Sequence, residues 1–420
     1  MSAPFESTER KLQVDGEYLQ KVMLELLSIP SPAGLTDEIV HYTCAKLEEL
    51  GMAYELTRRG TIRCILRRTL PERRQFSAAC AIVSHLDTLG AMVRQIKSNG
   101  RLALAPIGTW SSRWAEGGRV TLFAGKRRLR GTVLPLLASG HVYSDMVDKQ
   151  PVDWSQLELR IDADIHNEQQ ALAHDIRVGD FIAFDPQPEI METGYVVSRY
   201  LDDKAGVAAV LAALKAVREA GVDIHRNCHL VFTLSEEVGS GARAVIQSDV
   251  SEVIGIDIGP VAPQQCSRET CVTIPLMDSA GPHDFHLTHR LLALCEQHGI
   301  PCQRDVFPFY HSDAGAAVSA GHDVRTALIC FGCDASHGYE RTHLSSLTNL
   351  AQLLTVYMQS GLTFAADRRE RSDSAQQFPH QLEPHQLERE ETHTPPPSEL
   401  VPREHDAPAG DQLPGEPGGR

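Results

Sequence analysis

Two short, uninterrupted apolar runs constrain the fold of this chain more than any other feature. They are residues 78–84 and 229–234, and neither alternates between apolar and polar positions. A strand without such alternation is covered on both faces, as in sheets that carry helices on each side. After residue 203 a helical stripe follows, with Val207, Val210 and Leu214 at three- and four-residue spacing. We therefore predict an α/β fold.

The segment 95–194 differs in texture from its surroundings. Five short β-like runs in it are bounded by glycine and proline, which predicts a small barrel or sandwich. Because the α/β pattern resumes after it, we predict a catalytic domain of residues 1–94 and 195–365 that is interrupted by an inserted β-rich domain. The segment 366–420 has almost no large apolar residues and is predicted to be a disordered tail.

Composition excludes several classes of function. The chain has 420 residues and a formal net charge of −15, which argues against a nucleic-acid partner. Its apolar runs are far shorter than the ~20 residues that span a bilayer, and residues 1–14 lack the apolar core of a signal peptide. We expect a cytoplasmic protein without a membrane partner. The Cys330–Cys333 pair has no second CxxC motif with which to form a four-thiolate zinc site.

Two adjacent carboxylates, Glu236 and Glu237, follow the second apolar run and precede a glycine-rich turn. Taken alone, such a pair is more often a solvated strand end, because acidic side chains are seldom buried without a partner or a metal. However, the ends of neighbouring strands meet at one edge of an α/β sheet, where sites form. The other candidates at strand ends, helix starts and a late loop are His85 and Asp87, Asp202 and Asp203, Asp257, and His343.

These residue types indicate a metal centre. Two histidines and three carboxylates can hold two divalent cations, with one carboxylate bridging them; zinc suits the set best, with cobalt or manganese as alternatives. Two such ions activate water and polarise a carbonyl. A further carboxylate must then move the proton. Glu236, next to a ligand but not itself one, suits that task, and Glu237 suits metal binding.

Several motifs resemble those of the di-zinc aminopeptidases, the family of glutamyl aminopeptidase, the misnamed "cellulase M" proteins and the tetrahedral (TET) aminopeptidases. The similarity covers about residues 16–362. The motifs, in the family's order, are residues 84–93, 201–206, 236–239 and 255–257, and His343. The resemblance implies a mixed-sheet α/β/α catalytic domain with an inserted small β-barrel-like dimerisation domain. It also implies a short-peptide substrate and a homo-oligomer, either a dimer or a dodecamer.

The resemblance further implies individual roles. One metal ion would be held by His85 and Asp257, and the other by Glu237 and His343. Asp202 would bridge the two ions, and the Asp202–Asp203 peptide bond would be cis. Glu236 would be the general base, and Asp87 would orient His85 from behind.

A bacterial branch of the family is similar in residues 105–110, 179–188 and 334–343. That branch accompanies biosynthesis of the osmoprotectant N-acetylglutaminylglutamine amide (NAGGN), which suggests a link to osmotic-stress metabolism. The chain departs from the family at residues 311–315, where His-Ser-Asp-Ala-Gly replaces the common Gly-Thr-Asp-Ala near the substrate pocket. His311 is therefore a candidate for altering which substrate end is recognised.

We expect a metal-dependent aminopeptidase. One alternative is an amidohydrolase or deacylase that acts on an N-acetylated glutamine dipeptide or its amide. Another is a non-catalytic scaffold of the same pathway. Blocked substrates separate the first two, because an aminopeptidase should not cleave an N-acetylated dipeptide amide.

Overall fold

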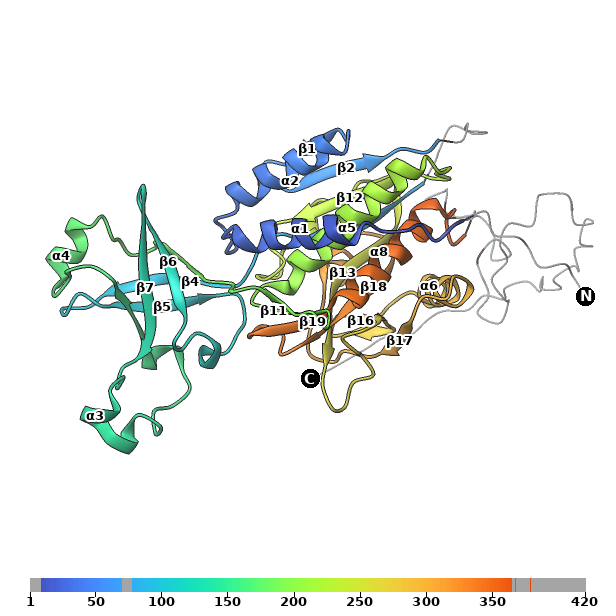
Figure 1. Cartoon of the computed structure of the whole chain (residues 1–420). Coiled ribbons are helices and arrows are strands. Elements are labelled where there is room, and N and C mark those ends of the chain that lie inside the picture. The colour runs from blue at the N-terminus through green and yellow to red at the C-terminus, as the bar shows by residue number, and fades with distance from the viewer. Residues whose placement is uncertain (1–8, 70–77, 365–366, 368–377, 379–420) are drawn as a thin grey trace, which may run out of the picture. The chain divides into compact units, whose positions relative to one another are not determined.

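The computed structural model describes residues 9–69, 78–364, 367 and 378 (Figure 1). Apart from Asp367 and Phe378, the predicted tail 366–420 lies outside the described residues. Among the residues described, no helix is both long and apolar enough to cross a membrane. The helices are α1 (Gly16–Ser28), α2 (Asp37–Glu49), α3 (Gly140–Tyr143), α4 (Glu168–Ala173), α5 (Leu201–Ala220), α6 (Phe285–Gln297), α7 (Asp313–Ser319) and α8 (Leu344–Gln359), with short 3₁₀ turns η1 (Ser112–Trp114), η2 (Ser144–Met146), η3 (Trp154–Gln156) and η4 (Ala242–Ala244).

Within the described residues, eleven strands form one mixed sheet, as expected for an α/β fold. Its main path has the order β1-β2-β12-β3-β13-β18-β19-β11-β10, and β14 joins β18 to β17 beside it. The strands are β1 (Tyr54–Leu56), β2 (Ile62–Leu66), β3 (Ala79–His85), β10 (Glu189–Ile190), β11 (Tyr195–Ser198), β12 (Cys228–Thr233), β13 (Val250–Val261), β14 (Val272–Pro275), β17 (Cys302–Asp305), β18 (Arg325–Asp334) and β19 (Glu340–His343), with a separate ribbon of β15 (Met277–Asp278) and β16 (Gly281–Pro282).

The two apolar runs of the sequence are central strands of this sheet. Every residue of β3 and of β12 is buried. Cys80 and Ile82 of β3 face a core that includes α1, α5 and α8, whereas Ala81 and Val83 face a second core built with η4 and α7. Both faces of β3 are therefore covered, which accounts for the absence of alternation in its sequence.

The inserted segment forms a closed barrel of six strands, counted among the described residues (Figure 1). The sequence predicted five of them and missed the first, β4, which directly follows the first motif. The domain limits at residues 95 and 194 stay a prediction, and the first barrel strand begins at Gly90. The barrel order is β4-β5-β8-β7-β6-β9, with β4 (Gly90–Ile96), β5 (Leu102–Ile107), β6 (Arg119–Ala124), β7 (Arg127–Pro135), β8 (Leu157–Ile161) and β9 (Phe181–Phe184).

Strand direction decides which residues meet at one edge of the sheet. The neighbouring pairs β12–β3, β3–β13 and β13–β18 are all parallel, so the carboxyl ends of these strands lie at the same edge. Thr233 pairs with His85, the last residues of β12 and β3. Strand β11 is antiparallel to β19, which is antiparallel to β18, so β11 delivers the start of α5 to that edge as well.

Candidate active site

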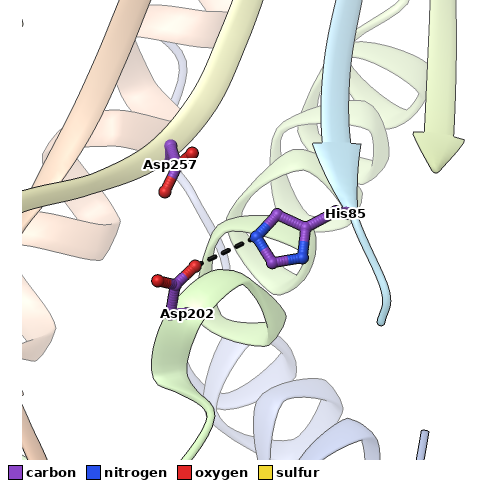
Figure 2. Close-up of side chains that lie close together, drawn as sticks. All are labelled: His85, Asp202 and Asp257. Atoms are coloured by element: carbon purple, nitrogen blue, oxygen red, sulfur yellow. Dashed lines mark hydrogen bonds and ion pairs between the residues drawn. The ribbon is translucent and has the colours of Figure 1, made fainter. Parts of the chain in front are cut away.

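His85, Asp202 and Asp257 come together from three different elements. His85 ends β3, Asp257 lies in β13, and Asp202 lies in the first turn of α5. All three are buried, and one potential ligand atom from each lies within 4.8 Å of the others. Figure 2 shows their side chains directed into a common space, with Nε2 of His85 3.0 Å from Oδ1 of Asp202.

A second group of potential ligands shares Asp202 with the first. It consists of Asp202, Glu237 and His337, and it is the other such group found among the residues that the structure describes. Nε2 of His337 lies 3.5 Å from Oδ2 of Asp202 and 3.5 Å from Oε2 of Glu237. Asp202 thus turns one carboxylate oxygen toward each histidine, as expected of a bridging ligand.

Burial strongly perturbs the ionisable groups of both clusters. Burial raises the pKa of Glu237 to about 8, and burial with the nearby Asp202 charge raises the pKa of Asp257 well above its usual value. Burial would also raise the pKa of Asp202, but His337 and His85 hold it below the ordinary value. Contact with Asp202 and Glu237 outweighs burial and raises the pKa of His337 to about 10. Confined carboxylates of this kind repel one another when ionised.

This donor set fits divalent cations. Imidazole nitrogen and carboxylate oxygen are ligands of zinc, and they also suit cobalt and manganese. Two groups that share one buried carboxylate offer positions for a pair of ions, whose charge would offset the repulsion among the carboxylates.

Glu236 belongs to neither ligand group, although it lies beside the first. Its Oε2 is 4.0 Å from Nε2 of His85, and its side chain is 15% exposed. Burial and the charges of Asp257 and Asp313 raise the pKa of Glu236 well above its usual value, against the influence of His85. A carboxylate with a raised pKa at the rim of the cluster can accept and return a proton.

The side chain of Asp87 holds the glutamate pair in place, whereas its backbone contacts the histidine. Its Oδ1 accepts a hydrogen bond from the backbone N–H of Glu236 (3.1 Å), and its Oδ2 accepts one from that of Glu237 (3.3 Å). Nδ1 of His85 donates to the backbone oxygen of Asp87 at 2.9 Å, whereas the Asp87 carboxylate lies 3.7 Å from that nitrogen. Burial raises the pKa of Asp87 to about 6. The main chain of Asp87 therefore orients His85.

Asp203 turns away from the two groups. Its carboxylate accepts hydrogen bonds from the Ser84 hydroxyl and the His85 backbone N–H, and so fixes the end of β3. The Asp202–Asp203 peptide bond is cis, as the family resemblance implied. A Cβ at Gly206 would lie 2.0 Å from Oδ1 of Asp203, so the glycine in this motif leaves room for the buried carboxylate.

The structure does not bring His343 to either group of potential ligands, in contrast to the expectation from the sequence. His343 caps α8: its Nδ1 accepts a hydrogen bond from the backbone N–H of Ser345, and its Nε2 donates to the backbone oxygen of Thr193. It pairs with Tyr195, the first residue of β11, and therefore lies at the opposite end of that strand from the one that leads to Asp202.

His337 was missed, although the sequence contained a usable signal. It comes three residues after β18, which is the parallel neighbour of the strand that carries Asp257. The rule that placed the other ligands at strand ends would therefore have favoured His337 over His343. Glu340 was also missed: its buried carboxylate accepts hydrogen bonds from the backbone N–H groups of Asp202 and His337.

Comparison with known proteins points to a family of aminopeptidases. The model of the M42 glutamyl aminopeptidase family matches residues 69–353. YhfE of Bacillus subtilis (strain 168), which carries a provisional aminopeptidase assignment, is 37% identical over 341 residues, covering 81% of this chain and 97% of that protein.

Two solved structures share the fold. The aminopeptidase APDkam598 from Desulfurococcus kamchatkensis superposes with a TM-score of 0.72 at 21% identity, over 82% of this chain and 95% of that one. PhTET1-12s, described as a dodecamer, gives a TM-score of 0.70 at 21% identity, over 82% of this chain and 98% of that one.

Proposed function

Since this chain belongs to the M42 glutamyl aminopeptidase family and is therefore a peptidase, we propose that it removes amino-terminal residues from short peptides with the help of two metal ions. The observation that carries the proposal is the division of Asp202 between two groups of potential ligands. His85 and Asp257 would complete the first site, and Glu237 and His337 the second. Zinc is the preferred ion, with cobalt or manganese as alternatives.

The protein's own residues would bind the two ions, orient the reacting groups and move the proton. Ions bound there would supply Lewis-acid polarisation of the peptide carbonyl and activation of the attacking water. Glu236 would accept the proton of that water at its carboxylate and pass it to the leaving amine. The Asp87 carboxylate accepts a hydrogen bond from the backbone N–H of Glu236 and would so hold Glu236 in reach of the reacting atoms.

Replacement of Glu236 tests the proton-transfer role. We expect Glu236→Gln to lower kcat by about 100-fold or more, because general acid–base catalysis contributes about 10²–10⁴-fold, while two metal ions still bind. Glu38→Gln is a suitable control, since Glu38 forms an exposed pair with Arg128. A Glu236→Gln enzyme with near-normal kcat on every cleaved peptide would refute the assignment of Glu236 as the general base.

A substrate panel tests the type of reaction. The metal-reconstituted enzyme is assayed against free and N-acetylated dipeptides that contain Gln, Glu or Leu. We expect cleavage of the free peptides alone. Cleavage of the acetylated forms would favour the amidohydrolase alternative. The osmoprotectant link is proposed on the resemblance of residues 105–110, 179–188 and 334–343 alone.

We also propose that the protein is a homo-oligomer. The long connection between β7 and β8 exposes apolar side chains of Val142 (71%), Met146 (55%) and Val152 (53%). Exposed apolar residues gathered in one connection are typical of an interaction surface, and the similar protein PhTET1-12s is described as a dodecamer. Light scattering behind a sizing column measures the mass; a monomer at micromolar concentration would contradict the proposal.

A further inference from the structure

Glu340 connects the two ligand groups from behind. It begins β19 and is 1% exposed. Its Oε2 accepts a hydrogen bond from the backbone N–H of Asp202 at 3.1 Å, and its Oε1 accepts one from the backbone N–H of His337 at 3.0 Å. One buried carboxylate thus ties the shared ligand to the histidine of the second group. Neither hydrogen bond is part of regular secondary structure, so each serves this local arrangement.

The inserted barrel holds His337 from the other side. Thr109, in the connection that follows barrel strand β5, accepts a hydrogen bond at its backbone oxygen from Nδ1 of His337 at 2.9 Å. This contact places the proton on Nδ1 and leaves Nε2 free to face Asp202 and Glu237, as outer contacts of metal-binding histidines do. Gly108 also packs against Glu237: a Cβ there would lie 3.3 Å from the Glu237 backbone oxygen.

The loop that carries His337 requires such support. Ala335 and His337 have positive φ angles of 55° and 59°, a region that residues other than glycine adopt only at a cost. Trp114 of η1 lies directly over the loop, since a Cβ at Gly338 would be 2.7 Å from Cε2 of its indole ring. The conformation of residues 335–338 is thus stabilised by contacts from a distant part of the sequence.

We propose that Glu340 is a positioning residue and that, together with barrel residues 108–114, it forms a brace that sets the second metal site. The inserted barrel is then a structural part of the metal centre as well as a candidate surface for assembly. This inference rests on the proposed function, because it concerns the site formed by Asp202, Glu237 and His337.

Metal titration of the metal-free full-length protein tests the brace without reference to turnover. Zinc is added in competition with a chromophoric chelator, and two dissociation constants are fitted. We expect Glu340→Gln to weaken the second ion by about 10- to 100-fold, the usual effect of losing an outer contact, and to change the first much less. Glutamine keeps the volume but turns an NH₂ group toward one of two N–H donors.

Three further variants keep the test decisive. Trp114→Ala removes a 37% exposed side chain on the barrel side and should weaken the second ion in the same way, with Trp114→Phe restoring most of the affinity. Glu158→Gln is the control. Glu158 is a buried carboxylate whose partners, Lys97 and Arg101, both belong to the inserted segment. The two zinc affinities of this variant should equal those of the wild type.

The outcomes separate the two proposals. If the wild type binds fewer than two zinc ions, the metal pair of the proposed function fails, and the brace fails with it. If the wild type binds two ions while folded Glu340→Gln and Trp114→Ala bind both as tightly, the brace alone is wrong. If Glu340→Gln does not fold, the variants Trp114→Ala and Trp114→Phe decide the question.

Discussion

His337 and His343 lie six residues apart, and the structure places them in different surroundings. Nε2 of His337 faces two buried carboxylates, whereas both ring nitrogens of His343 are engaged by Ser345 and Thr193. Both follow the strand that ends at Asp334, and His337 is the nearer of the two to that strand end. His337 precedes the reversal of chain direction at β19, whereas His343 ends β19 beside Tyr195, the first residue of β11.

Alanine substitution at the two histidines should therefore give unequal results. We expect His337→Ala to lower kcat/KM by at least ~100-fold and to weaken the second metal ion, because loss of even an outer contact costs about 10- to 100-fold. His343→Ala should keep both ions and lose about 1 kcal/mol of stability with the helix cap. Steady-state kinetics, metal titration and thermal unfolding measure the three effects. The reverse pattern would restore the original assignment of His343.

Gly206 is a second residue at which the site imposes a local requirement. A Cβ there would meet Oδ1 of Asp203 at 2.0 Å and Cγ2 of Ile256 at 2.9 Å. We expect Gly206→Ala to destabilise the protein by about 1–3 kcal/mol, the usual range for overpacking, and to weaken metal binding because Asp203 fixes the end of β3. Gly16→Ala is the matched control, since nothing lies within 4 Å of its added Cβ. Equal melting temperatures of the two variants would contradict this account.

At the level of elements, a buried carboxylate of β13 pairs with an arginine that precedes β12 and accepts hydrogen bonds from α8 and from the segment that follows it. Arg226 lies 3.6 Å from Oε2 of Glu252, and both side chains are almost fully buried. Glu252 also accepts hydrogen bonds from the Tyr357 hydroxyl (2.9 Å) and from the Thr363 backbone N–H. The side chain of Arg290 donates a hydrogen bond to the backbone oxygen of Leu362. Hydrogen bonds with buried charged side chains therefore fasten residues 357–363 to the sheet.

Removal of one partner from this pair should be costly. We expect Glu252→Gln to destabilise the protein by about 3–5 kcal/mol at pH 7, because Arg226 would be left as an uncompensated buried charge. Denaturant unfolding measures the shift of the midpoint. Glu219→Gln, which removes only an exposed partner of Lys215, should cost less than about 1 kcal/mol. An unchanged midpoint for Glu252→Gln would show that the pair contributes little.

The same pair predicts a pH dependence. Burial alone would raise the pKa of Glu252, but Arg226, Arg290 and the Thr363 amide together lower it below the ordinary value. A carboxyl group with a lowered pKa in the folded state stabilises the protein fully above the unfolded pKa of about 4.3, and this contribution is lost as the pH falls through the folded value. The stability difference between wild type and Glu252→Gln should therefore shrink below pH 4. A constant difference down to pH 3 would contradict the linkage.

For the whole molecule, the buried carboxylates predict that metal removal lowers stability. A ligand that binds only the folded state stabilises it by about 2.7 kcal/mol at 100 times its dissociation constant. We expect a chelator to lower the thermal midpoint of the wild type and zinc to restore it. Glu236→Gln should keep this response, because Glu236 lies outside both ligand groups. A midpoint that chelator and zinc leave unchanged would argue against resident metal ions.

Much of this fold could be predicted from local sequence. The unalternating runs at residues 78–84 and 229–234 became central strands, because burial on both faces must be written into every position of such a strand. The barrel was visible from short β-like runs between turn residues. Its first strand, β4, was missed because its identity depends on pairing with β5 and β9.

The sequence by itself determined the chemical types at the site and the strand ends that carry most of them, because side-chain chemistry and burial periodicity are local properties. Only the tertiary structure decided which histidine joins Glu237, how Asp202 divides its two oxygens, and that Thr109 of the barrel contacts His337. Those facts follow from strand direction, register and the packing of segments more than 200 residues apart. No local pattern encodes such contacts, since each one depends on the position of the whole sheet.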